Sequence, residues 1–352
     1  MKVEIDYDLF DSIKQEEDVI ELNYLLNIIL YKNRHSVYVT DTRVFKLEVY
    51  DSIPKTTQSV IELFFTQNVM TSEEKDCLIC FDGASFDDEK KFNLVEGIRY
   101  LSQPVSIIVE NSFNDSHFFK AIFRCFDDSE IINKHFENLW IQFENSGGCS
   151  NIINYIKGRS QFYNDRSKFF RCFVILDSDK LSPNDTNDKY SNVKEFISLK
   201  KIATHVLEKR MMENYIPDEA INANIHERYN KWKNAYLHLS ELQKDYYNIP
   251  SGFIKVTSQA GKKTSKRDKK KEIKKNQLDA LPEQVKNLYS DLSSSNFESL
   301  KSGLSIPNIK SEFPKFFNCE HTVYKKSLLQ RTRHQRNPHE LSDIVEKIMK
   351  LI

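Results

Sequence analysis

The sequence lacks an excess of either charge, and it lacks any long apolar run. Lys plus Arg and Asp plus Glu both number 51 among 352 residues, so the global charge indicates no partner and only local charge can. No apolar run approaches the roughly 20 residues that a membrane-spanning helix needs, and we expect no membrane partner. The segment Met1–Asp6 is too acidic and too short in apolar character for a signal peptide. These absences favour a cytoplasmic location.

Cysteine is also scarce, with six residues scattered along the chain. Most of them have apolar neighbours, which is typical of reduced, buried thiols in a cytosolic protein. Cys77 and Cys80 have the spacing of a zinc-ligand pair, but no second Cys/His pair of suitable spacing follows them. We therefore interpret residues 77–81 as a strand and not as part of a zinc site.

Apolar residues at 39% and aromatic residues at 12% fit a folded protein of two or three domains. Residues 1–100 form the first of these, an N-terminal α/β unit. Its apolar spacing predicts helices over 19–31 and 59–67 and strands over 36–40, 44–49 and 77–81. Asp41 and Asp82 follow predicted strands and are candidates for catalysis. Asp is common in such turns for backbone reasons alone, and we favour that interpretation.

Residues 101–222 alternate between strands and helices. Short β-branched runs predict strands over 105–109, 138–143, 171–176 and 203–207, with helices over 115–125, 150–157 and 191–201 between them. Largely apolar strands of this kind are typical of a parallel sheet that is buried on both faces. A helix over 210–230 is expected to leave the sheet. The expected fold class is α/β, with this Rossmann-like domain at the centre.

Residues 223–352 are expected to form a mostly helical C-terminal extension, which ends in an amphipathic helix after Pro338. Within it, residues 261–275 form a basic linker with nine Lys or Arg against two acids. The linker either tracks a phosphate backbone or is a solvated charge run, and both interpretations stay open. Its candidate nucleic-acid contacts are Lys262, Lys263, Lys269, Lys270 and Lys271.

Acidic residues follow three of the central strands directly. Glu110 comes after the first strand, Asp177 and Asp179 come after the third, and Glu208 and Glu213 come after the last. In an open α/β sheet, ligands bind at the carboxyl ends of the strands. Carboxylates gathered there repel one another unless a cation holds them together, so the pattern predicts a divalent-metal site.

Each acidic cluster also has a purely structural interpretation. Asp177 and Asp179 are placed to cap the loop that follows them, and Glu213 with Asn214 is placed to cap a helix. It is the coincidence of three clusters, each behind a strand, that favours the metal site.

The order of these clusters resembles the TOPRIM domain, which is shared by topoisomerases, bacterial primases and a set of nucleases. Residues Leu207–Ile216, L-E-K-R-M-M-E-N-Y-I, are similar to the "L-E-x-R-E-x-E-N-Y" segment of OLD-type nucleases and of related TOPRIM effectors of bacterial anti-phage defence. The resemblance covers residues 104–220. Two positions depart from it, since Asn111 stands where the family has glycine and Met211 where it has glutamate.

The resemblance implies a site for Mg²⁺ or Mn²⁺, which is consistent with oxygen-only ligands. The implied metal ligands are Glu110, Asp115, Asp177, Asp179, Glu208 and Glu213. The implied catalytic residues are Glu110, Asp177, Asp179, Glu213 and Lys325. Glu110 is the candidate general base. Lys325, or its neighbour Lys326, would neutralise the leaving group. Lys209 and Arg210 are expected to contact phosphate.

Two cations held by such carboxylates stabilise both the attacking and the leaving oxygen of a phosphodiester. The expected function is therefore a Mg²⁺-dependent nuclease, a hydrolase and endonuclease acting on DNA or RNA, transfer RNA included. The resemblance implies an effector of antiviral defence. It also implies an ATPase sensor as a partner protein, because no Gly-x-x-x-x-Gly-Lys-Ser/Thr motif is present. The amphipathic last helix offers a packing surface, for instance for a second copy in a homodimer.

Two other functions stay open at this point. The chain is alternatively a non-catalytic interaction protein that keeps a degraded TOPRIM core and binds an ATPase, which Asn111 and Met211 favour mildly. The second alternative is a topoisomerase or primase. It is disfavoured because the sequence shows no winged-helix segment with a strand-transfer tyrosine and no primase zinc module.

Overall fold

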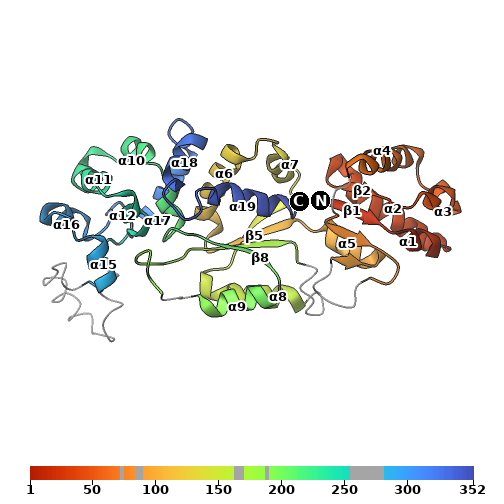
Figure 1. Cartoon of the computed structure of the whole chain (residues 1–352), viewed down its shortest axis with the longest axis horizontal. Helices are drawn as coiled ribbons and strands as arrows, with labels where there is room; N and C mark the ends of the chain where they lie inside the picture. The colour runs from red at the N-terminus through yellow and green to blue at the C-terminus, as the bar shows by residue number, and fades with distance from the viewer. Residues whose placement is uncertain (72–74, 84–89, 162–169, 187–189, 254–280) are drawn as a thin grey trace.

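The chain folds around two four-stranded parallel sheets, which are followed by a helical region. The computed structural model describes residues 1–71, 75–83, 90–161, 170–186, 190–253 and 281–352. The first sheet has the strand order β2-β1-β3-β4 and the second has the order β6-β5-β7-β8, so the two sheets share one topology. Figure 1 shows the first sheet at one end of an elongated molecule and the second in its middle. The α/β fold class expected from the sequence is confirmed.

The N-terminal unit is built on the first sheet and has a hydrophobic core of its own. The helices predicted over 19–31 and 59–67 and the strands predicted from 36 and 77 are confirmed. Its elements are β1 Lys2–Ile5, α1 Tyr7–Ser12, α2 Glu16–Leu30, η1 Tyr31–Asn33, β2 Ser36–Tyr38, η2 Thr42–Lys46, α3 Glu48–Asp51, α4 Lys55–Thr71, β3 Cys77–Ile79, β4 Lys91–Phe92 and α5 Leu94–Ser102.

The strand predicted over 44–49 is wrong, because η2 and α3 occupy this stretch. The Asp41 carboxylate accepts a hydrogen bond from the Arg43 backbone N–H at 2.9 Å and so caps the first of the two turns. Val44 and Val49 are buried in the core, as strand residues would be, but they reach it from helical turns. Asp41 thus has the backbone role that the sequence favoured.

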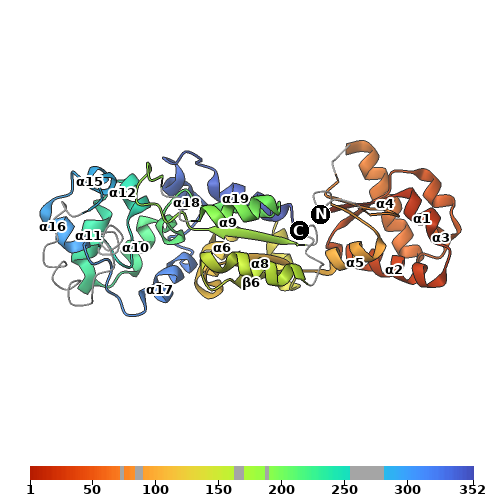
Figure 2. The same ribbon diagram turned by 90° about the horizontal axis from the view of Figure 1, so that it is seen from below.

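The central domain is a sheet covered by helices on both faces. Val105, Ile107 and Val109 of β5 pack toward α6 and α19, whereas Ile108 packs toward α8 and α9. Figure 1 shows these two pairs of helices on opposite sides of the sheet, and Figure 2 views the domain from the side of α8 and α9. The elements are β5 Val105–Val109, α6 Ser112–Phe126, α7 Ile131–Glu137, β6 Ile141–Asn145, η3 Cys149–Asn151, α8 Ile152–Ser160, β7 Cys172–Leu176, α9 Ser191–Leu199 and β8 Ala203–Val206.

The C-terminal helices are built onto the central domain, since one continuous core cluster runs from β5 to the last residues of the chain. The final helix, α19, lies against α6. The elements of this region are η6 Met212–Tyr215, α10 Asp218–Asn224, η7 Glu227–Tyr229, α11 Asn230–Leu237, α12 Glu241–Tyr246, α15 Glu283–Leu288, α16 Ser294–Leu300, α17 Ile309–Glu312, η10 Phe313–Asn318, α18 Lys325–Thr332 and α19 Glu340–Met349.

The single helix predicted over 210–230 is also wrong, because this stretch is divided into η6, α10 and η7. The Asn214 side chain accepts from the Met211 N–H at 3.1 Å and donates to the Lys244 carbonyl at 2.7 Å, which closes a short turn. Pro217 follows that turn and has no N–H to continue a helix. The chain therefore makes a tight turn after β8, next to the carboxyl edge of the sheet.

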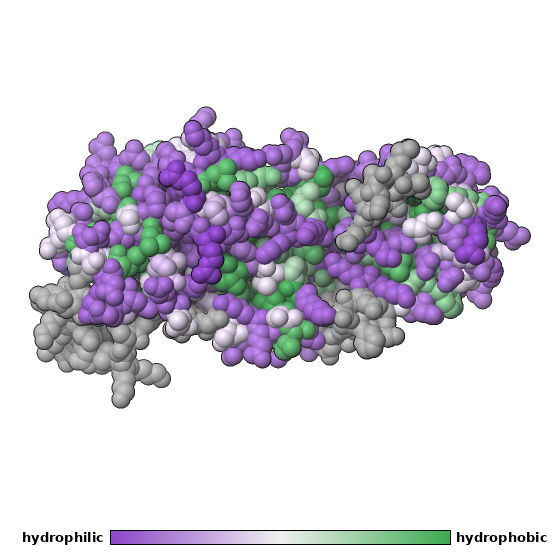
Figure 3. All heavy atoms as spheres, viewed as in Figure 1, coloured by the Kyte–Doolittle hydropathy of each residue, from purple (hydrophilic) through white to green (hydrophobic). Residues whose placement is uncertain are grey.

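The surface is mainly hydrophilic on the face drawn in Figure 3, where apolar residues appear in small groups between polar ones. In the described part of the chain, no helix combines the length and the apolar character that crossing a membrane requires.

Arg171, just before β7, fastens the junction between the two sheets to the end of the chain. Its side chain is 2% exposed, and its guanidinium donates to the carbonyls of Leu101 at 3.2 Å, Gln103 at 2.8 Å and Leu351 at 2.7 Å. Arg34 donates to the Gln103 carbonyl as well, at 2.6 Å. Two buried arginines therefore fix the linker that leads from the first sheet to the second.

We predict that Arg171→Met lowers the free energy of unfolding by about 3–5 kcal/mol, because it removes three hydrogen bonds to buried carbonyls. Urea denaturation measures this change. The matched control is Arg99→Met, since Arg99 is exposed on α5 and its loss should cost less than about 0.5 kcal/mol. Equal stability of the two variants would contradict the role given to Arg171.

Candidate metal and phosphate site

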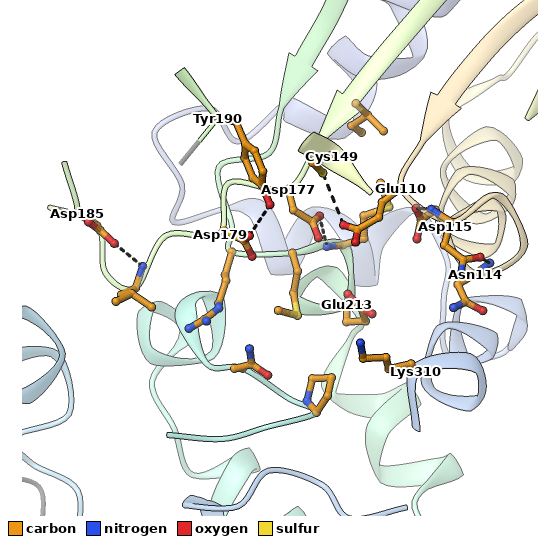
Figure 4. Close-up of a pocket in the computed structure, with 18 residues that line it drawn as sticks. Glu110, Asn114, Asp115, Cys149, Asp177, Asp179, Asp185, Tyr190, Glu213 and Lys310 are labelled. Atoms are coloured by element: carbon orange, nitrogen blue, oxygen red, sulfur yellow. Dashed lines mark hydrogen bonds between the residues drawn. The ribbon is translucent and has the colours of Figure 1, made fainter. Parts of the chain in front are cut away.

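One cavity of about 520 Å³ lies at the carboxyl edge of the second sheet, where Figure 4 shows several carboxylates directed into a common space. Glu110 follows β5, Asp177 and Asp179 follow β7, Asp115 lies in the first turn of α6, and Glu213 lies in η6. All five line the cavity, together with Asp185. The structure thus brings together side chains that are up to about a hundred residues apart in the sequence.

The start of α6, directly after Glu110, positions the carboxylate of Asp115. Asn111 caps this helix, and its side-chain oxygen accepts from the N–H groups of Phe113 and Asn114, both at 3.1 Å. The Asp115 carboxylate accepts in turn from the Asn111 N–H at 2.8 Å. Asn111 has an extended backbone, with φ of −138°, so a glycine is not needed at this position. The departure from the family pattern at Asn111 is therefore compatible with the cavity.

The loop after β7 is fastened to the segment after β8. Asp177 accepts a hydrogen bond from the Met212 N–H at 3.1 Å, and Asp179 donates its own N–H to the Arg210 carbonyl at 2.9 Å. Asp179 also accepts from the Tyr190 hydroxyl at 2.7 Å and has a left-handed backbone, with φ of 53°. Asp185 closes the following loop, because it accepts from the Leu181 N–H at 2.9 Å.

Burial and mutual repulsion act on the protonation of these carboxyls. Burial raises the pKa of Asp115 from 3.8 to about 7. The charges of Glu213 and Glu110 act in the same direction, whereas the hydrogen bond from the Asn111 N–H opposes them. Burial, followed by the charges of Glu213 and the other carboxylates, raises the pKa of Asp177 well above its usual range. The pKa of Glu213 is raised for the same reason. The cavity is therefore an unfavourable place for several negative charges without a cation.

The donor set fits a hard divalent cation, because it consists of carboxylate oxygens. Within the described residues, however, no three His, Cys, Asp or Glu side chains stand close enough together to hold a metal ion. Individual hydrogen bonds orient the carboxylates instead, such as the 3.6 Å contact from the Cys149 thiol to Glu110. The cavity therefore contains suitable ligands, but they do not have the geometry of a complete metal-coordination site.

Two residues predicted to act in the site serve the fold instead. The Glu208 carboxylate accepts from the N–H groups of Arg336 at 3.1 Å and Asn337 at 2.9 Å, and Glu208 does not line the cavity. Lys209 is 1% exposed and pairs with Asp245 at 2.5 Å. The predicted metal role of Glu208 and the predicted phosphate contact of Lys209 are corrected accordingly, since both side chains are occupied away from the cavity.

The basic residues of the C-terminal region need a similar correction. Lys325 pairs with Asp128 at 2.9 Å, and neither it nor Lys326 is among the residues that line the cavity. The candidate contacts of the basic linker, Lys262, Lys263, Lys269, Lys270 and Lys271, lie outside the described residues.

Lys310 is a cavity residue that the sequence did not indicate. It lies in α17, and Figure 4 shows its side chain extending toward Glu213 from the opposite wall. Its positive charge acts to lower the pKa of Glu213, against the larger effect of burial. No motif surrounds Lys310, so only the packing of the C-terminal region reveals it. Arg210, by contrast, was expected from the sequence and lines the cavity.

The first sheet has a smaller cavity of about 310 Å³ at its own carboxyl edge, whose lining includes Asp6, Asp8 and Asp82. Asp82 is exposed and stands three residues after β3, just as Asp179 stands three residues after β7. Asp82 is therefore a suitable control position for substitutions of the carboxylates at the edge of the second sheet.

Comparisons of the chain with protein-family models, curated proteins and solved structures find no match. Its function therefore has to be argued from the cavity itself.

We predict that the cavity carboxylates make stability fall as pH rises in the absence of metal. A carboxyl whose pKa is higher in the folded state binds more protons when folded, and for Asp115 the window runs from 3.8 to about 7. Asp177→Asn should therefore raise the free energy of unfolding at pH 7.5 in EDTA, because it removes one of the mutually repelling charges from the buried cavity.

Thermal unfolding at pH 4.5 and pH 7.5, with EDTA or with Mg²⁺, measures this effect. Mg²⁺ should stabilise the parent at pH 7.5 more than the variant, and Asp82→Asn serves as the control that leaves the response unchanged. If the parent and Asp177→Asn show the same pH dependence in EDTA, the described electrostatics of the cavity are wrong.

Proposed function

We propose that this chain is a divalent-metal-dependent nuclease that hydrolyses phosphodiester bonds in DNA or RNA. The observation that carries the proposal is the convergence of Glu110, Asp115, Asp177, Asp179 and Glu213 on one cavity. Two basic side chains, Arg210 and Lys310, line the same cavity. Phosphoryl-transfer chemistry requires this combination, in which carboxylates bind the cations and basic side chains contact the phosphate.

The proposed division of labour follows from the positions of the residues. Glu110, Asp177 and Asp179 would hold Mg²⁺ or Mn²⁺, with Asp115 and Glu213 completing the set. The bound ions would supply charge stabilisation at the attacking and leaving oxygens. Glu110 remains the candidate general base for the attacking water.

The neutralisation of the leaving oxygen, which the sequence assigned to Lys325, falls in this proposal to Lys310. Lys310 lies in the cavity, whereas Lys325 is paired with Asp128. An ammonium group near the leaving oxygen offsets the negative charge that develops as the phosphodiester bond breaks.

The wider role rests on the sequence resemblance alone. We propose an effector of anti-phage defence that works with an ATPase sensor. A homodimer is a separate proposal, and the apolar residues of the last helix, on which the sequence based it, are buried in the core beside α6. The choice between DNA and RNA, including transfer RNA, is left to experiment. A topoisomerase or primase role is not favoured by any feature of the cavity.

The alternative of a non-catalytic interaction protein is favoured by one observation. Met211, which stands where the resembling family has glutamate, lines the cavity and brings no charge to it. The two functions differ in their metal dependence, because a degraded site should show no stabilisation by Mg²⁺ and no cleavage.

We predict that the purified protein cleaves DNA or RNA with Mg²⁺ or Mn²⁺ and not with EDTA. Asp177→Ala should lower the cleavage rate by at least about 100-fold, because it removes a central ligand. Asp82→Ala, whose place after β3 corresponds to that of Asp179 after β7, should cleave as the parent does. Incubation with labelled DNA and with total cellular RNA, followed by gel analysis, measures both variants.

If Asp177→Ala cleaves as well as the parent, the cavity is not the catalytic site. If the parent fails to cleave any nucleic acid with either ion, and fails again when the ATPase partner implied by the resemblance is added, the nuclease proposal is wrong.

A further inference from the structure

Arg210 is a buried cation on the wall of the cavity that holds the carboxylates. Its residue is 5% exposed, and its backbone is fixed on both sides. Its N–H donates to the Asp245 carbonyl at 3.0 Å, and its carbonyl accepts from the Asp179 N–H at 2.9 Å. The position of Arg210 is therefore set by the main chain and does not depend on its own side chain.

The guanidinium of Arg210 has few partners for its degree of burial. Within the described residues its one side-chain hydrogen bond runs from Nη1 to the Tyr246 carbonyl at 3.3 Å. Its Nε has no hydrogen-bond partner in the described part of the chain, and this is equally true of Nε in Arg34, Arg171 and Arg331. The terminal nitrogens therefore distinguish Arg210, since among the same residues they make one hydrogen bond whereas those of Arg171 and Arg331 make three each. No carboxylate of the described residues forms an ion pair with it, although Asp179 is near enough to favour its charged form.

Arg331 shows what a structural buried arginine looks like in this chain. It is 3% exposed, and its guanidinium is bonded to Glu241, to Asp245 at 3.3 Å and to the Asn214 carbonyl at 2.7 Å. A guanidinium has five N–H donors and keeps its charge in proteins. Leaving it buried with one long hydrogen bond is costly unless an anion completes its surroundings.

Asn248 provides a second hydrogen-bond donor on the wall of the cavity. It is 6% exposed and lines the same cavity. Its side-chain oxygen accepts from the Ser251 N–H at 2.9 Å, so the amide orientation is fixed and the NH₂ group remains as a donor. Both residues line one cavity, and a planar guanidinium together with an amide NH₂ offers donors that suit the oxygens of a phosphate group.

We propose that Arg210 and Asn248 form a second anion subsite, which binds a phosphate of the substrate next to the one that is cleaved. The inference rests on the proposed nuclease function and narrows its substrate class. The cleaved phosphate belongs beside the carboxylates, with Lys310 on the side of Glu213 (Figure 4). Arg210 is next to Asp179, whose N–H donates to the Arg210 carbonyl and whose charge favours the charged guanidinium. The substrate is accordingly a chain with at least two phosphates, and the second phosphate is either an internal phosphodiester or a terminal phosphate.

The test compares an oligonucleotide with bis(p-nitrophenyl) phosphate, a phosphodiester that has no second phosphate. Arg210→Met should lower kcat/KM for the oligonucleotide by about 10- to 100-fold, as expected for the loss of a charge-assisted hydrogen bond, and the loss on the small diester should be at least about tenfold smaller. Arg210→Lys should restore part of the difference. Arg333→Met, which changes an exposed arginine, is the matched control.

Neutral linkages locate the phosphate that Arg210 contacts. A single methylphosphonate beside the cleaved bond should slow the parent by about tenfold and Arg210→Met by less than about twofold, because the two changes remove the same contact. Oligonucleotides with 5′-phosphate or 5′-hydroxyl ends distinguish a terminal phosphate from an internal one.

If Arg210→Met lowers kcat/KM equally on both substrates and unfolds at the same temperature as the parent, Arg210 has only a structural role. That result would overturn the subsite. If the parent cleaves neither substrate, alone or with the ATPase partner added, the nuclease proposal has failed independently. Calorimetry with pyrophosphate without metal then decides the subsite, because the parent should bind it at least about tenfold more tightly than Arg210→Met. Equal binding would overturn it.

Discussion

Repulsion between carboxylates at the carboxyl edge of the second sheet governs the chemistry of its cavity. Asp115, Asp177 and Glu213 are drawn into one cavity, and burial together with their neighbours raises the pKa of each. Ionised carboxylates destabilise a fold in such a place unless cations or protons offset their charge. The chain as a whole has as many basic as acidic side chains, yet it concentrates negative charge at this edge. This concentration of charge is the basis of the proposal that a cation binds there.

The C-terminal region holds the third acidic segment in place. Glu340 is fully buried, accepts from the Glu208 N–H at 2.8 Å and is hydrogen-bonded by the Tyr215 hydroxyl. Asp245 meets Lys209 at 2.5 Å and Arg331 at 3.3 Å in the interior. Such a satisfied buried network is rigid, and it fixes the turn that carries Arg210 and Glu213. Residues 223–352 therefore shape the cavity even where they do not line it.

The carboxylates after the strands could be predicted from the sequence, because β-branched apolar runs mark strand ends and parallel strands end at one edge. Glu110, Asp177 and Asp179 were found in this way. The burial of Lys209 could not be predicted, since its partners Asp245 and Arg331 are 36 and 122 residues away. Lys310 enters the cavity through helix packing that no local pattern encodes. The apolar spacing over 44–49 suits a strand equally well, but Asp41 caps the first of the two helical turns that occupy this stretch.

Diffraction from crystals grown or soaked with Mn²⁺ tests most directly whether the cavity carboxylates cage a divalent cation. We expect an anomalous peak in the cavity at about 2.0–2.3 Å from oxygens of Glu110 and Asp177, because hard cations take carboxylate ligands at such distances. The peak should be absent from crystals of a variant in which Asp177 is alanine. Well-ordered carboxylates without any anomalous peak at millimolar Mn²⁺ and neutral pH would contradict the account.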